Sequence, residues 1–239
     1  KRGGKPMNQF MGSIAEICKS HPLTSKVIIV PNYHVGQEIL KSIVLETGSW
    51  INLKVATLEN LARENISSKL SRNEFQVIDD KVAVAILQKI ILKLQTENKF
   101  EYFKNDDSLN QLLPLLLSSI NELRRIGITA DVLCPDCFVS TTKGRDIKQI
   151  MVRYQEELRK RKLIDTADVI AIATSEIPDC EQNDTMFLIL DYMDFSPQER
   201  KLLHKISLGN LLLLDSETIF GIEPLSEPYW DLKRVSAKT

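Results

Sequence analysis

The sequence predicts an α/β fold in which a parallel sheet is interrupted by a long helical segment. Short uninterrupted apolar runs recur near both ends of the chain, and such runs are typical of strands buried on both faces. Helical patterns alternate with these runs, which favours parallel strands joined by helices. From Phe75 to about Thr174 only helical periodicity is present. We therefore expect an α/β core with a large all-helical insertion.

The predicted domain organisation follows from this pattern. Residues 1–74 are expected to form the first part of the α/β core, and residues 176–239 its remainder. Residues 75–175 are expected to form the inserted helical subdomain. A chain of 239 residues is long enough to bury a core of this kind.

In the first part, helices and strands alternate. A helix is expected over residues 7–20, followed by a strand over residues 26–31 that ends at a proline. The next helix, over residues 35–48, ends at Gly48, a residue type that commonly terminates helices. A second strand ends just before Thr57, whose hydroxyl is placed to cap the following helix.

The middle segment contains three helices that each carry an apolar stripe at helical spacing. Pro114 starts or kinks the second of them. A fourth helix, over residues 165–174, has Asp165 as its expected N-cap and Asp168 at the third helical position. The three stripes are Val82, Ile86, Ile90 and Leu94; Leu112, Leu116, Ile120 and Leu123; and Ile147, Ile150, Met151, Tyr154 and Leu158.

The stretch "FLILDYMDFSPQER" (187–200) combines a strand, two acids and a helix start. Ser196 and Glu199 have the spacing of a capping box, with a proline in the first helical position. The layout is similar to a helicase-type ATPase strand that delivers two acids to a magnesium ion, but those acids are adjacent. Whichever way Asp191 and Asp194 are aligned on that pattern, one essential acid is missing. We interpret both as relics of a nucleotide and metal site.

A phosphate-binding "GxxxxGK[ST]" loop is absent from the sequence. Its nearest equivalent is "RGGKPM" (2–7), where Pro6 takes the place of the metal-binding hydroxyl. Two interpretations stand: a decayed phosphate loop whose strand is missing, or an unrelated leader or tag before Met7. We expect no ATP hydrolysis and no cofactor in this chain, and the sequence gives little support for ATP or Mg²⁺ binding.

A formal net charge of −1 argues against a globally positive surface, so any attraction to nucleic acid must be local. Arg159, Lys160, Arg161 and Lys162 form one basic cluster at the end of a predicted helix. This cluster is either a solvated helix face or a surface that follows DNA phosphates. Because every apolar run is shorter than the ~18–20 residues of a membrane span, we expect no membrane partner.

The four cysteines favour a reducing, cytoplasmic setting over a disulfide framework. The motif "CPDC" (134–137) is open to two interpretations. It is a pair of free thiols around a proline turn, or it is a redox pair or half of a zinc site.

Several segments, in order along the chain, resemble the N-terminal helicase-like region of the AddB family. AddB is the second subunit of bacterial AddAB recombination nucleases, related to UvrD-type superfamily-one helicases. The similar segments are "KVIIVPNYHVGQEIL", "LKVATLENLARE", "NELRRIGI", "GRDIKQIMVRYQEELRKRKLIDTADVIAIA" and "FLILDYMDFSPQERKLL". The last resembles the degraded second ATPase motif of such chains.

The resemblance implies a fold like that of P-loop NTPases, with a RecA-like core, in the form of an inactivated motor domain. It also implies an AddA-like helicase-nuclease motor as partner, and DNA, either single-stranded or at a duplex end. Thr57 falls where related helicases contact single-strand phosphate, although its hydroxyl also suits a plain helix cap. By the same resemblance, Asn32 lies on a turn that faces the same DNA strand. The nuclease and the iron–sulfur cluster of such proteins lie near the far C-terminus, outside this chain.

The resemblance therefore implies an ATPase-inactive domain of an exonuclease subunit in double-strand-break repair. Such a domain would guide DNA and dock a motor subunit. Two alternatives remain open: a purely structural docking domain without DNA contact, and an active superfamily-one motor.

Overall fold

The computed structural model describes residues 9–48, 52–72, 74–104, 109, 111–178, 184–214 and 234–235. The chain divides into two compact units. Unit 1 comprises Lys1–Leu61, Ile177–Phe195 and Arg200–Thr239, and unit 2 comprises Ala62–Glu176 and Ser196–Glu199. The "RGGKPM" segment lies outside the described residues.

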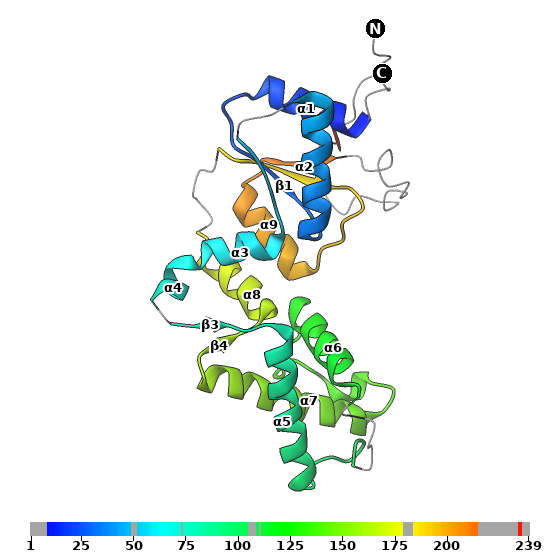
Figure 1. The fold of residues 1–239 in the computed structure, drawn as a ribbon. Coiled ribbons are helices and arrows are strands. Elements are labelled where there is room, and N and C mark those ends of the chain that lie inside the picture. Colours follow the sequence, from blue (N-terminus) through cyan, green and yellow to red (C-terminus); the bar gives the residue numbers. More distant parts are fainter. Residues whose placement is uncertain are drawn as a thin grey trace. The chain divides into compact units, whose positions relative to one another are not determined.

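A parallel sheet with the strand order β2-β1-β5-β6-β7 forms the centre of unit 1 (Figure 1). All four residues of β1 are buried, and since successive side chains of a strand point to opposite faces, both faces of this strand are covered. The predicted α/β class and parallel sheet are therefore confirmed, whereas the RecA-like type of core and the insertion stay predictions. The strands are β1 (Lys26–Ile29), β2 (Leu53–Ala56), β5 (Met186–Leu190), β6 (Leu211–Leu214) and β7 (Arg234–Val235).

Helices α1 (Gln9–Ser20) and α2 (Tyr33–Thr47) lie side by side and share one apolar cluster with the sheet. The predicted cap at Gly48 is confirmed, since this residue ends α2 with a φ of 88°, which glycine adopts readily. Helices α3 (Leu58–Asn65) and α9 (Pro197–Ser207) each contribute residues to both units. The cluster contains Phe10, Met11, Ile14, Ile17, Cys18, Ile28, Val30, Ile39, Ile43, Leu188, Leu190 and Leu214.

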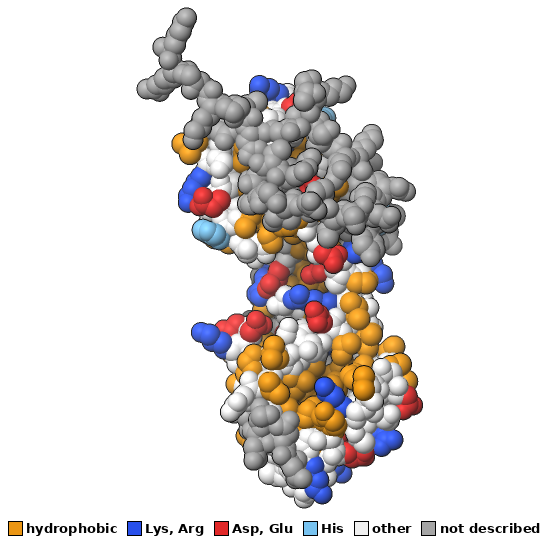
Figure 2. Space-filling view, turned by 90° about the vertical axis from the view of Figure 1, so that its right-hand side faces the viewer, with side chains coloured by type: hydrophobic (Ala, Val, Ile, Leu, Met, Phe, Trp, Pro, Cys, Tyr) orange, Lys and Arg blue, Asp and Glu red, His pale blue; other side chains and the backbone are white. Residues whose placement is uncertain are grey.

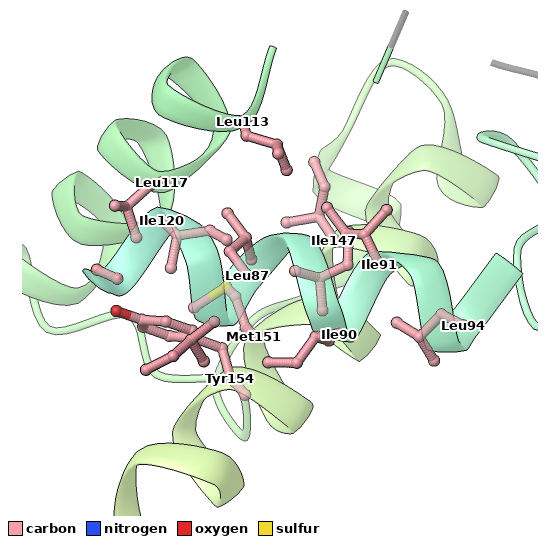
Figure 3. Packing of buried hydrophobic residues seen from close by; sticks show 14 of the residues in the cluster. Leu87, Ile90, Ile91, Leu94, Leu113, Leu117, Ile120, Ile147, Met151 and Tyr154 are labelled. Atoms are coloured by element: carbon pink, nitrogen blue, oxygen red, sulfur yellow. The ribbon is translucent and has the colours of Figure 1, made fainter. Parts of the chain in front are cut away.

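Unit 2 has its core between α5 (Asp80–Thr96), α6 (Leu113–Arg125) and α7 (Thr141–Lys160). Figure 3 shows side chains from these three helices meeting in one apolar cluster. The smaller elements are α4 (Ser67–Ser71), the 3-10 turn η2 (Pro135–Cys137), α8 (Thr166–Glu176), β3 (Gln76–Val77) and β4 (Leu163–Ile164).

The predicted stripe of α7 is confirmed in full, because all five of its residues are buried. The stripe of α6 is confirmed in part: Ile120 is buried, and Leu116 and Leu123 pack half-buried against the cluster. Leu112 is 42% exposed, and Leu113 and Leu117 are buried in addition to the predicted residues. In a helix so rich in leucine, several faces have the same apolar spacing, and the neighbouring helices select one. In α5, Val82 is 44% exposed while the rest of its stripe is buried.

Residues 75–175 are not entirely helical, which corrects the prediction. The strands β3 and β4 pair in parallel, with Gln76 opposite Leu163 and Val77 opposite Ile164. A strand of two residues is too short to show alternation, so its pairing is not visible in the sequence. Each helix among the described residues is too short or too polar to cross a lipid bilayer.

Two close contacts fix the start of α7. The Asp146 carboxylate accepts the backbone N–H groups of Glu101, Tyr102 and Phe103 at 3.1, 2.8 and 3.0 Å. At Gly144, a Cβ atom would lie 2.5 Å from the carbonyl oxygen of Pro135. The backbone of α7 therefore approaches η2 at a position where only glycine fits.

We expect Gly144→Ala to destabilise the protein by about 1–2 kcal/mol. Alanine favours a helix over glycine by up to ~1 kcal/mol, but overpacking against fixed backbone costs ~1–3 kcal/mol. Urea unfolding followed by circular dichroism at 222 nm measures the difference. Arg153→Ala, on the exposed side of the same helix, is the control and should change stability little. A Gly144→Ala variant as stable as the parent would contradict the close approach.

Candidate nucleic-acid interface

The carboxyl ends of β1 and β2 bring two predicted site residues to one edge of the unit 1 sheet. Ile29 and Ala56 are partners in these adjacent parallel strands. Asn32 follows the first strand and Thr57 follows the second, so both lie at the same edge. Ligands of parallel α/β sheets bind at this edge, in the crevice outside the strand ends.

Both residues cap helices. The Oδ1 atom of Asn32 accepts the N–H of Val35 at 3.0 Å at the start of α2, where Asn32 is exposed. The Oγ1 atom of Thr57 accepts the N–H of Asn60 at 3.2 Å at the start of α3. The predicted cap at Thr57 is thus confirmed, and its phosphate contact stays a prediction. Positive partial charge at the amino ends of α2 and α3 favours an anion at this edge.

Tyr33 is an exposed aromatic residue at the same edge that the sequence reasoning missed. It is the first residue of α2, directly after Asn32, and is 70% exposed. An exposed aromatic ring beside anion-binding helix ends suits stacking on a nucleobase. Its position immediately after "VPN" was the signal that could have identified it.

The two acids predicted as relics occupy different environments. Asp191 directly follows β5, is buried, and donates its backbone N–H to the Leu214 carbonyl at 3.0 Å. Burial, and next the negative charge of Asp191, raise the pKa of Tyr192. Asp194 has a side chain that is 75% exposed and accepts a hydrogen bond from Arg200 at 3.1 Å. The structure therefore places one acid inside the unit and ties the other to a cation.

The basic cluster lies at the carboxyl end of α7, where all four side chains are exposed. Cations at this end stabilise a helix by offsetting its negative partial charge. Arg161 forms an ion pair with Glu157 at 2.5 Å. Arg159, Lys160 and Lys162 form no ion pair with any residue that the structure describes. The four charges are therefore not equivalent.

The "CPDC" cysteines are free and exposed on and beside η2. The hydrogen bond between the Cys137 and Cys134 side chains, and next the negative charge of the Cys134 thiolate, raise the pKa of Cys137. Within the described residues, no group of three or more His, Cys, Asp and Glu side chains is arranged to hold a metal ion. The motif is therefore still open to both interpretations: free thiols around a proline turn, or a redox pair or half of a zinc site.

A family profile described as "ADDB, N-terminal" matches residues 4–209, which is most of the chain. The chain belongs to the AddB N-terminal family. It is the N-terminal region of an AddB-type subunit, as the resemblance predicted. A search among curated proteins found no significant match.

The structure gives a physical role to residues within the AddB-like segments of unit 2. Arg124 of α6 donates to Asp165, directly before α8, and to Asp168 of α8, with 2.5 Å between the paired atoms in each case. Its guanidinium carbon also lies 5.9 Å from the ring centre of Tyr154, in α7. The Tyr154 hydroxyl donates to Asp165 at 3.0 Å. We call these four residues the Arg124 network.

The network also begins α8. Asp165 accepts the N–H of Asp168 at 3.0 Å, and Asp168 accepts the N–H of Asp165 at 3.4 Å, which confirms the predicted N-cap. Burial alone would lower the pKa of Arg124, but the charges of the two aspartates outweigh it and raise that pKa. Burial raises the pKa of Asp168; Arg124 opposes this rise, and the charge of Asp165 adds to it.

Replacing Arg124 by methionine should destabilise the protein by about 3–5 kcal/mol at neutral pH, since two largely buried carboxylates lose their cation. The loss should shrink as the pH is lowered. Without Arg124 the folded-state pKa of Asp168 rises further above its unfolded value. Such a group stabilises the fold below its unfolded pKa, and that stability is lost as pH rises through the folded pKa.

Urea unfolding at several pH values measures this effect. Arg153→Met is the matched control, because the ion pair of Arg153 with Glu156 is exposed and 3.7 Å long, and such pairs contribute ~0–1 kcal/mol. A loss for Arg124→Met that stays constant with pH would show that the aspartates do not depend on this cation.

Proposed function

We propose that this chain is an ATPase-inactive, helicase-like domain of an AddB-type exonuclease subunit in DNA double-strand-break repair. In this role it guides single-stranded DNA or a duplex end and docks an AddA-like motor subunit in the cytoplasm. Membership of the AddB family supports the repair setting. The observation that carries DNA guidance is the convergence of Asn32 and Thr57 at one edge of the parallel sheet.

The contacts at this edge suit a DNA strand without requiring sequence recognition. Two helix amino ends offer positive partial charge to phosphates, and Tyr33 offers an exposed ring to a base. Backbone contacts of this kind position a strand but carry no sequence information directly. The edge is therefore suited to holding a strand of any sequence.

The absence of ATP hydrolysis is proposed from the acids and from the missing phosphate loop. Asp191 and Asp194 do not form an adjacent pair, and Asp194 is tied to Arg200. A magnesium-dependent motor needs one acid on the metal and another group to orient the attacking water. We therefore expect neither ATP nor Mg²⁺ to be bound by Asp191 and Asp194.

A purely structural docking domain is the second candidate, and the surface of unit 2 favours it. Figure 2 shows hydrophobic side chains gathered on the face of unit 2 turned to the viewer, in the lower part of the picture. Exposed apolar residues are common on interaction surfaces. Those of unit 2 include Leu115 at 67%, Ile126 at 48%, Val132 at 68% and Val139 at 112% exposure.

DNA guidance predicts that Asn32→Asp and Thr57→Asp each weaken binding of a labelled oligothymidylate by about three- to tenfold. Aspartate caps a helix as well as asparagine and better than threonine, so the fold is retained, while its charge repels phosphate. Fluorescence anisotropy at two salt concentrations measures the affinity. The logarithmic salt dependence should fall by about 0.7 for each phosphate contact that is lost.

Ser140→Asp is the matched control, since Ser140 caps α7 through the N–H of Lys143 and belongs to unit 2, not to the sheet of unit 1. It adds the same charge at another helix start and should leave affinity unchanged. If the parent does not bind the oligonucleotide at low salt, DNA guidance by this domain is wrong and docking is the better account.

The inactive-motor proposal predicts no ATP turnover above background, with or without single-stranded DNA. A coupled phosphate-release assay on the purified chain measures it, with a competent superfamily-one helicase as positive control. Turnover stimulated by DNA and lost on Asp191→Asn would instead support the active-motor alternative.

A further inference from the structure

Unit 2 contains a cavity of about 200 Å³ at the carboxyl end of α7. Its apolar lining includes Phe75, Leu163 and Ile172, and its cationic lining includes Arg159 and Lys162. Pockets for drug-sized ligands measure roughly 300–1,000 Å³, so this cavity has room only for a smaller group. Single-strand binding proteins combine aromatic rings, on which bases stack, with cations that contact the phosphates, and this cavity contains a half-buried aromatic ring and two cations.

The position of the two cations is set by the backbone. Lys162 has a φ of 54°, a left-handed conformation that is uncommon outside glycine. Its N–H donates to the Arg159 carbonyl at 3.2 Å, and its own carbonyl accepts the N–H of Gln76 at 2.9 Å. Both polar backbone groups of Lys162 are thus bonded, which fixes the point from which its side chain reaches the cavity.

Charge at the cavity favours an anion only through Arg159 and Lys162. Arg124 also lines the cavity, but its guanidinium is already held by Asp165 and Asp168. Among the described residues, neither Arg159 nor Lys162 has an ion-pair partner. The network has one guanidinium for two carboxylates, so its formal charge is −1. Arg159 and Lys162 add two positive charges, which leaves this side of the cavity with an excess of positive charge for an anion.

We propose that this cavity seats one nucleotide of single-stranded DNA, with the base against Phe75 and the phosphate on Arg159 and Lys162. The proposal rests on the DNA-guiding function above and gives it a second contact point, in unit 2. It also divides the basic cluster, because Lys160 and Arg161 do not line the cavity. If the cluster only stabilised the end of α7, removing any one of its four cations would have the same effect on DNA binding.

The test is the affinity of the full 239-residue chain for an oligothymidylate, measured by anisotropy at low salt. Arg159→Gln and Lys162→Gln should each weaken binding about tenfold, since charge-assisted hydrogen bonds to phosphate are lost. Lys160→Gln is the matched control, with the same charge change in the same cluster, and should weaken binding less than about twofold. Circular dichroism confirms that each variant is folded.

A second comparison tests the base. Phe75→Leu keeps an apolar side chain but removes the ring, and should weaken oligothymidylate binding about fivefold or more, because a stacked base contributes substantially. An oligonucleotide of abasic sugar phosphates should bind the parent and the Phe75→Leu variant equally. A matching loss with both oligonucleotides would place the defect in folding and overturn base binding.

The outcomes separate this proposal from the broader function. Binding that is equally sensitive to Lys160→Gln and Lys162→Gln, or insensitive to both, overturns the cavity site and leaves guidance at the unit 1 edge standing. No oligonucleotide binding by the parent overturns both. Selective loss with Arg159→Gln, Lys162→Gln and Phe75→Leu supports the site.

Discussion

The pairing of Arg124 with Asp165 and Asp168 is the interaction on which unit 2 depends most. A single guanidinium, 6% exposed at its side chain, connects α6 to the start of α8, and Tyr154 brings α7 to the same point. Buried ion pairs contribute little net stability, but breaking one leaves a buried charge without compensation. The network therefore acts as a specificity constraint that holds three helices in one arrangement.

This constraint has consequences beyond the network. Fixing α7 against α8 also positions the segment between them, where β4 pairs with β3. The left-handed turn at Lys162 lies in that segment, so the placement of Arg159 and Lys162 depends on a buried interaction in which neither takes part. The buried residues of the Arg124 network thus hold the charged end of α7 in place.

The local structure was largely predictable. Capping chemistry is encoded by neighbouring residues, so the caps at Thr57, Asp165 and Ser196 are as predicted. The buried stripe of α7 was also predictable, because its other positions are polar. The stripe of α6 was predictable only in part, since adjacent leucines such as Leu112 and Leu113 offer competing faces and only the packing partners decide between them.

The sequence by itself determined the α/β class, the parallel strands, the caps that begin α3, α8 and α9, and the AddB-like order of segments, because each depends on residue types a few positions apart. Tertiary structure alone decided the rest. Arg124 lies 41 residues from Asp165, a separation that no local pattern reports. Likewise, four adjacent basic residues look equivalent in sequence, but in the fold Arg159 and Lys162 line a cavity and Arg161 pairs with Glu157.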